Sequence, residues 1–122
     1  MKEKLDVLVV DDEPEILQLL ELLLSRRGFS VKTALNGLEA ISTLNAYDVK
    51  VLLTDLKMPA LSGMKLIELV RMDFPEVKVL VFTGFGSLET ETKALKMGVS
   101  RYFLKPLPVE ELLSELNDVC KT

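Results

Sequence analysis

Residues 5–16 read LDVLVVDDEPEI, a nearly uninterrupted apolar run that ends in two adjacent aspartates. A run that is apolar along its length, rather than at alternate positions, is typical of a strand buried on both faces of a parallel sheet. Asp11 and Asp12 would then stand side by side at the end of this strand, where their carboxylates repel each other. This acidic pair therefore needs a physical explanation.

The same apolar pattern recurs at 49–54 and 77–82, and helical periodicity fills the gaps between the runs. The expected elements are strands at 5–10, 30–34, 49–54, 77–82 and 101–104 and helices at 14–27, 37–45, 63–72, 88–97 and 109–119. Gly28 and Gly98 lie where the first and fourth helices should end. This alternation predicts one doubly wound α/β domain with right-handed crossovers, spanning residues 1–122.

The composition of the chain argues against several classes of function. Its 15 basic and 19 acidic residues are interspersed and give a net charge of −4, so direct contact with nucleic acid is not expected. Because the chain has no histidine, it cannot donate a phosphoryl group from its own imidazole or build a histidine-based metal site. Cys120 is a lone cysteine, which suits a reducing compartment. With no apolar run of membrane-spanning length and no secretory signal, we expect a cytoplasmic protein without membrane contact.

Polar side chains follow four of the expected strands at the point where each strand ends. These are Asp11-Asp12, Thr54-Asp55, Thr83-Gly84 and Lys105-Pro106. In doubly wound sheets, ligands bind beyond the carboxyl ends of the strands, where the strand order reverses. We therefore expect three carboxylates, a hydroxyl and an ammonium group to gather at one edge of the sheet.

Three neighbouring carboxylates need a counter-charge. Two like charges about 4 Å apart repel by roughly 4 kcal/mol at an effective dielectric constant of about 20, and a whole domain is stable by only about 5–15 kcal/mol. A hard divalent cation such as Mg²⁺ neutralises such a cluster, because it takes oxygen ligands and keeps waters or a phosphate oxygen in its shell. Asp11, Asp12 and Asp55 are therefore candidate Mg²⁺ ligands, although the Asp11-Asp12 pair alone would fit a solvated turn or a helix cap equally well.

Asp55 differs from the other two acids, because it ends a strand reading VLLTD and precedes LKMP. At the mouth of the same site, its carboxylate can touch a metal and also act as a nucleophile. Attack on phosphorus gives an acyl phosphate, a reaction that needs positioning and charge neutralisation more than acid–base chemistry. Lys105 can pair with phosphoryl oxygens, and Thr83 can donate a hydrogen bond to them. Since the chain lacks histidine, the phosphoryl donor would be another protein.

Taken in order, the motifs resemble the receiver (response regulator) domain family of two-component signalling. They are VLVVDDE, LLTDLKMPALSGM, VFTGFGSLETETKALKMG and YFLKPLPVEEL, and together they cover essentially the whole chain. The resemblance implies that Asp55 is the phosphoacceptor. It also implies that Asp12, Asp55 and the backbone carbonyl of Lys57 hold Mg²⁺, with Mn²⁺ as a substitute. Asp11 would support the ion through water.

The resemblance further implies how a switch would work. Phosphorylation of Asp55 would draw Thr83 and Lys105 inward, and Tyr102 would rotate from an exposed to a buried position. The fourth helix and the fifth strand would move with these side chains. The bond between Lys105 and Pro106 is a candidate for the cis form.

Fold and partners follow from the same resemblance. It implies a three-layer, flavodoxin-like (chemotaxis-regulator-like) fold whose five-stranded parallel sheet has the order 2-1-3-4-5. Expected partners are a histidine kinase or histidine phosphotransfer protein and an output domain or downstream protein, and a dimer that forms on phosphorylation also fits. The chain would be a signalling phosphoacceptor that catalyses only its own phosphorylation and dephosphorylation. The stretch TGFGSLETETKALKMG is most similar to receivers of the nitrogen-regulation type.

The first helix is more apolar than a helix with one buried face requires. The expected buried stripe consists of Ile16, Leu19, Leu20, Leu23 and Leu24. Leu22 lies about 140° from the centre of this stripe at 100° per residue. Because the helix borders the expected site, we interpret Leu22 as part of a docking surface for the phosphodonor, although an isolated exposed leucine is ordinary.

Three other functions fit parts of the pattern. A phosphatase of the haloacid dehalogenase type also uses a strand-end aspartate, but it needs a substrate-covering cap and a second acid where this chain has Lys57. The stretch Gly84-Phe85-Gly86 lacks the third glycine of a dinucleotide-binding fingerprint and follows the wrong strand. A receiver-like fold that serves only as a phosphorylation-independent interaction module is disfavoured, because every catalytic position is filled.

Overall fold

Strands and helices alternate along the whole chain. The computed structural model describes residues 2–58, 61–84 and 86–120, so Phe85 of the Gly84-Phe85-Gly86 stretch lies outside the described residues. The strands are β1 (Glu3–Val10), β2 (Val31–Ala34), β3 (Tyr47–Thr54), β4 (Lys78–Thr83) and β5 (Arg101–Leu104). The helices are α1 (Pro14–Arg26), α2 (Gly37–Ala46), α3 (Gly63–Asp73), α4 (Leu88–Lys96) and α5 (Val109–Cys120).

The five strands form one parallel sheet in the order β2-β1-β3-β4-β5. This order confirms the predicted flavodoxin-like α/β fold. The chain moves from β1 outward to β2 and then returns to the other side of β1, so the strand order reverses between β1 and β3. In the register of this pair, Val10 lies opposite Thr54, and the two strands therefore end side by side.

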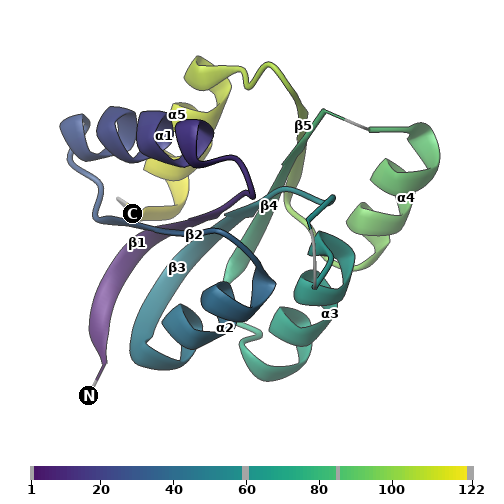
Figure 1. Cartoon of the computed structure of the whole chain (residues 1–122), viewed down its shortest axis with the longest axis horizontal. Coiled ribbons are helices and arrows are strands. Elements are labelled where there is room, and N and C mark those ends of the chain that lie inside the picture. Colours follow the sequence, from purple (N-terminus) through teal and green to yellow (C-terminus); the bar gives the residue numbers. More distant parts are fainter. Residues whose placement is uncertain (1, 59–60, 85, 121–122) are drawn as a thin grey trace.

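The sheet is covered on both faces, as continuous apolar strands require. Helices α1 and α5 lie over one face, and α2, α3 and α4 lie over the other (Figure 1). Leu8 and Leu52 point into the core beneath α2 and α3, whereas Leu24 and Leu112 close the core beneath α1 and α5. Each fully buried leucine contributes about 2 kcal/mol. Within the described residues, no helix has the length and apolar character needed to cross a membrane.

Helix ends follow the turn residues of the sequence. Gly28 and Gly98 have φ values of 92° and 96°, a left-handed conformation that glycine adopts without steric cost. The amides of Phe29 and Val99, which follow these glycines, reach back to carbonyls in the last turns of α1 and α4. The glycines therefore end both helices as expected. Asn36 instead begins α2, where its side chain accepts a hydrogen bond from the amide of Glu39.

The expected buried stripe of α1 is partly wrong. Leu17, Leu20 and Leu24 face the sheet and are at most 5 % exposed, whereas Leu19 is 64 % exposed. The helix is so rich in leucine that two overlapping stripes are available, and packing on the sheet and α5 selects the one with spacing i, i+3 and i+7. Leu22, which is 51 % exposed, shares the solvent side with Leu19.

Candidate functional site

Three carboxylates meet at the carboxyl edge of the sheet. Asp11, Asp12 and Asp55 each offer an oxygen, and these oxygens lie within 4.8 Å of one another. The topology creates this cluster, because β1 and β3 end side by side and the amide of Asp55 donates to the carbonyl of Val10 at 2.9 Å. Asp11 is fully buried and Asp55 is 5 % exposed, while Asp12 faces solvent. The structure thus brings together the three acids that the sequence singles out.

Lys105 completes the cluster from the end of β5. Its Nζ donates to Asp11 Oδ2 at 2.9 Å, lies 3.4 Å from Asp55 Oδ2 and lies 3.5 Å from Glu13 Oε1. The amide of Lys105 donates to the carbonyl of Thr83 at 2.9 Å, which holds the ends of β4 and β5 together. The bond between Lys105 and Pro106 is cis, as the resemblance implies.

Burial and mutual charge determine the protonation of this site. Burial raises the pKa of Asp11 above its ordinary value, and this effect exceeds the opposing influence of the Lys105 ammonium and the Glu13 amide. For Lys105, burial alone would lower the pKa, but the hydrogen bond with Asp11 and the charges of Asp11 and Asp55 raise it on balance. Lys105 is therefore firmly cationic, and positive charge near Asp11 favours the ionised form of that carboxyl.

Asp55 is oriented by the backbone that follows it. Its Oδ1 accepts from the amide of Leu56 at 2.7 Å and lies 3.4 Å from the amide of Lys57, which leaves Oδ2 directed at Lys105. The start of α3 presses against this turn, because a Cβ at Gly63 would lie 2.1 Å from the carbonyl oxygen of Asp55. Glycine at that position thus permits the close approach that fixes the turn.

The other predicted site residues are not members of this acidic cluster. Thr83 is the last residue of β4 and is fully buried. The Lys57 side chain is exposed beside Asp55. Tyr102 is half-buried on β5, and its hydroxyl forms a hydrogen bond with Thr90 of α4 at 2.9 Å. Leu22 projects from α1 into solvent and takes no part in the acidic cluster.

Sequence reasoning missed two residues with direct contacts to the predicted set. Glu13 is the third acid of the DDE stretch and reaches Lys105, so its position in the motif could have indicated it. Thr90 carries a weaker signal. It lies three residues after Ser87, at the spacing of a helix-capping pair, but nothing in the sequence shows that it also meets Tyr102.

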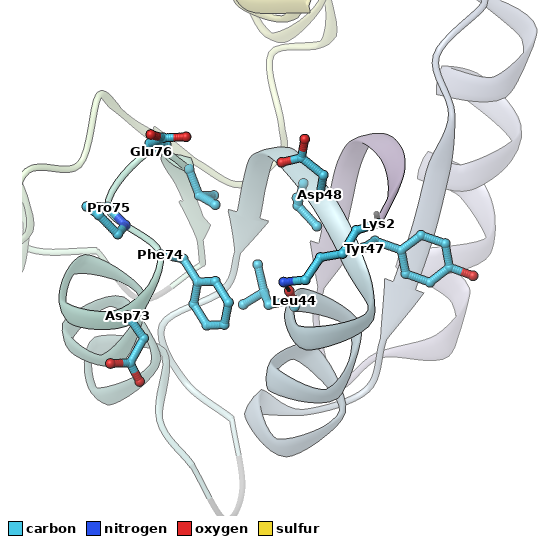
Figure 2. A pocket seen from close by; sticks show the side chains of 10 residues that line it. Lys2, Leu44, Tyr47, Asp48, Asp73, Phe74, Pro75 and Glu76 are labelled. Atoms are coloured by element: carbon cyan, nitrogen blue, oxygen red, sulfur yellow. Dashed lines mark hydrogen bonds between the residues drawn. The ribbon is translucent and has the colours of Figure 1, made fainter.

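A second concentration of acids lies at the opposite, amino edge of the sheet, around a hollow of about 240 Å³ (Figure 2). Its carboxylates belong to Asp48, Asp73 and Glu76, and in Figure 2 they do not converge on one point. Lys2 reaches into this hollow, where its Nζ lies 3.4 Å from the carbonyl oxygen of Leu44 and above the Phe74 ring. All three acids are exposed, so this edge lacks the burial that defines the other one.

Known proteins are similar to this chain in both sequence and fold. It is 34 % identical over 112 residues to the transcriptional regulatory protein GlrR of Escherichia coli, and the match covers 92 % of this chain and 25 % of that protein. It is 36 % identical over 105 residues to the response regulator protein PilR of Pseudomonas aeruginosa, covering 86 % of this chain and 24 % of PilR. The chain thus spans about a quarter of the length of these relatives.

The predicted likeness to nitrogen-regulation receivers agrees with an NtrX-like putative response regulator of Rickettsia felis, which is 32 % identical over 97 % of this chain and 25 % of its own length. A receiver domain from Clostridium thermocellum superposes with a TM-score of 0.86 at 35 % identity, covering 96 % of this chain and 94 % of that one. The Vibrio cholerae chemotaxis protein CheY4 also gives a TM-score of 0.86, at 30 % identity and with 95 % and 98 % coverage. Residues 7–117 match the family described as the response regulator receiver domain, and the chain belongs to that family.

Proposed function

We propose that this chain is a phosphoacceptor domain in which Asp55 accepts a phosphoryl group from a histidine kinase or histidine phosphotransfer protein. The observation that carries the proposal is the position of the Asp55 carboxylate. It is almost buried, it shares a cluster with Asp11 and Asp12, and its Oδ2 faces the Lys105 ammonium. A carboxylate so placed has a fixed orientation for attack on phosphorus. The excess of negative charge around it suits a cation that accompanies the incoming phosphoryl group.

In the proposed reaction, Oδ2 of Asp55 attacks phosphorus and the bond from phosphorus to the partner's imidazole nitrogen breaks. The electron pair of that bond stays on the imidazole, and Asp55 becomes an acyl phosphate. Lys105 pairs with a phosphoryl oxygen, and the Thr83 hydroxyl donates to another. The amide of Leu56 holds Oδ1 of Asp55 and so orients the attacking carboxylate.

The donor set fits Mg²⁺. Asp12, Asp55 and the backbone carbonyl of Lys57 would hold the ion, and Asp11 would support it through water, with Mn²⁺ as a substitute. Mg²⁺ would neutralise charge that develops on the phosphoryl oxygens. The raised pKa of Asp11 supports this assignment, since a buried carboxylate that resists ionisation gains from a nearby cation.

The acyl phosphate would act as a switch. It brings close to two negative charges to a site that already contains Lys105 and Thr83, and these side chains move toward it. Tyr102 would then change position together with α4 and β5 as the population shifts between two conformations. The altered face would signal to an output domain or downstream protein, or would form a dimer.

Intact-mass spectrometry tests the proposal. After incubation with Mg²⁺ and acetyl phosphate, the wild type should gain one phosphate, whereas Asp55→Asn and a sample without metal should gain none. Asp48→Asn is a matched control, because Asp48 lies near the other end of the same strand. If the wild type gains no phosphate and also fails to bind beryllofluoride, the phosphorylation-independent interaction module becomes the better description and a dehalogenase-type phosphatase is excluded with it.

The docking role of Leu22 belongs to the same proposal. Leu22→Ser should slow phosphoryl transfer from a partner histidine protein without affecting labelling by acetyl phosphate, since the small donor needs no docking surface. Leu19→Ser is the informative companion, because Leu19 lines an apolar hollow of about 460 Å³ with Pro106 and Leu107, next to Lys105. Unchanged transfer by Leu22→Ser, together with slow transfer by Leu19→Ser, would move the docking surface to the hollow.

A further inference from the structure

The hydroxyl of Thr90 takes part both in the cap of α4 and in a hydrogen bond with β5. It caps α4, because the amide of Ser87 donates to Thr90 Oγ1 at 3.0 Å while the Ser87 side chain accepts from the amide of Thr90. The same Oγ1 lies 2.9 Å from the hydroxyl of Tyr102 on β5. One oxygen atom thus connects the first turn of a helix with the residue proposed to switch.

The hydrogen-bonding capacity of this hydroxyl is fully used. A threonine hydroxyl has one hydrogen to donate and two lone pairs that accept. One lone pair accepts from the Ser87 amide, and the hydrogen can go to the Ser87 carbonyl, 3.1 Å away. Its other partners are the hydroxyls of Ser87, 3.1 Å away, and of Tyr102, and in each of these two pairs either oxygen can be the donor. Of these partners, Tyr102 alone belongs to another element, so its hydrogen bond is the one that joins α4 to β5.

Gly86 makes room for this contact. A Cβ at residue 86 would lie 3.1 Å from the Tyr102 hydroxyl and 2.3 Å from Cδ2 of Leu104. Any larger side chain would therefore press on the tyrosine just where it meets Thr90. The absence of a side chain at Gly86 and the hydroxyl at Thr90 are independent features of the sequence that favour the same position of the ring.

We infer that Thr90 is a positioning residue for the switch: its hydroxyl ties Tyr102 to the first turn of α4, so that the ring and the helix move as one unit. The inference rests on the proposed function, because it describes how a change at Asp55 reaches the surface of α4. Thr90 touches neither the acidic cluster nor the phosphoryl group, and it acts only through Tyr102. Without the tie, α4 would no longer follow the ring.

The effect of the hydrogen bond between Thr90 and Tyr102, called the tie below, can be tested without any phosphoryl group. The chain has only two tyrosines, Tyr47 and Tyr102, so ring-labelled tyrosine gives two sets of NMR signals, and Tyr47 serves as an internal reference. Thr90→Val should shift the Tyr102 signal, because loss of one hydrogen bond changes a local equilibrium by roughly twofold to tenfold. Thr90→Ser should keep the wild-type signal. Thr92→Val, on the same helix, controls for the loss of a hydroxyl, and a Tyr102 signal unmoved by Thr90→Val overturns the tie.

The transmission of a change at Asp55 to α4 is tested by adding Mg²⁺ and beryllofluoride and following amide NMR signals. The amides of Leu56 and Lys57 report on the site, and those of residues 88–96 report on α4. In Thr90→Val the site amides should respond as in the wild type, while the α4 response is lost. Thr90→Ser should restore it. Ser87→Ala weakens the helix cap but leaves the Thr90 hydroxyl for Tyr102, so it should keep the response.

An α4 response that survives in Thr90→Val, or is lost equally in Ser87→Ala, overturns the positioning role. A wild type whose Leu56 and Lys57 amides do not respond to beryllofluoride overturns the proposed function instead. The two failures are therefore distinguishable.

Discussion

The two ends of β3 each carry an aspartate, and the two aspartates have opposite surroundings. Asp48, near the start of the strand, is exposed and borders the hollow of Figure 2. Asp55, just past its end, is 5 % exposed and shares a cluster with two other acids and a lysine. Residue type and strand are the same, so the difference comes from what the neighbouring strands place beside each end.

At the carboxyl edge, β1 and β3 end side by side where the strand order reverses, and the connections that follow them leave toward opposite faces of the sheet. The polar side chains of Asp11 and Asp55 therefore converge in the gap between these connections. At the amino edge the exposed acids come from the start of β3, the end of α3 and the segment that follows α3, and Lys2 contacts a carbonyl oxygen and an aromatic ring. Convergence with burial, rather than the number of acids, distinguishes the candidate site.

The largest expected effect concerns the lysine at each edge of the sheet, Lys105 at the carboxyl edge and Lys2 at the amino edge. Lys105→Met leaves buried Asp11 without its cation, and we expect a loss of about 3 kcal/mol in the free energy of unfolding when a chelator is present. Lys2→Met should change that free energy by no more than about 0.5 kcal/mol. Urea unfolding followed by circular dichroism measures both.

Mg²⁺ should restore much of the stability that Lys105→Met loses, since the ion would neutralise the same carboxylates. Equal stabilities of Lys105→Met and Lys2→Met in chelator would mean that the buried cluster is no more dependent on its counter-charge than the exposed one is.

A smaller effect is expected for metal binding. Asp12→Asn removes a carboxylate from the cluster and should weaken Mg²⁺ binding by more than about tenfold. Asp73→Asn, at the amino edge, should leave the affinity unchanged. Isothermal titration calorimetry can compare both variants with the wild type, and a wild-type affinity in Asp12→Asn would remove this residue from the ligand set.

The sequence allowed the fold and the acidic cluster to be predicted because both depend on simple patterns. Continuous apolar runs mark buried parallel strands, and polar residues directly after such strands must share one edge. Asp11, Asp55 and Lys105 could therefore be placed together from their positions alone. The order of the strands came from the family resemblance, since periodicity does not determine which strand lies next to which.

Contacts that depend on the rotation of a helix or on a side-chain torsion could not be predicted in the same way. Leu19 was expected to be buried, but α1 packs through Leu17 instead, because a leucine-rich helix offers more than one apolar stripe. The bond between Tyr102 and Thr90 joins two elements whose relative position is set by tertiary packing. No local pattern encodes such a pair.

The smallest predicted effect is a pH dependence that belongs to the buried edge alone. Burial raises the pKa of Asp11 above its usual value of 3.8. Protons compete with Mg²⁺ for a carboxylate, so the affinity contributed by Asp11 should be complete above the raised pKa and lost as the pH falls through it. The loss should therefore begin at a higher pH than an ordinary aspartate would give.

Without metal, the contribution of Asp11 to the free energy of unfolding should instead increase as the pH falls. A group whose pKa is raised by folding stabilises the folded state below its unfolded pKa, and this contribution is lost as the pH rises through the folded value. Calorimetric Mg²⁺ titrations from about pH 7 to about pH 4 measure the first effect, and urea unfolding in chelator over the same range measures the second. Asp48→Asn should reproduce both wild-type profiles, whereas Asp11→Asn should flatten them. A wild-type affinity that does not vary over this range would show that the buried acid is ionised throughout, and would place the competition for protons elsewhere in the cluster.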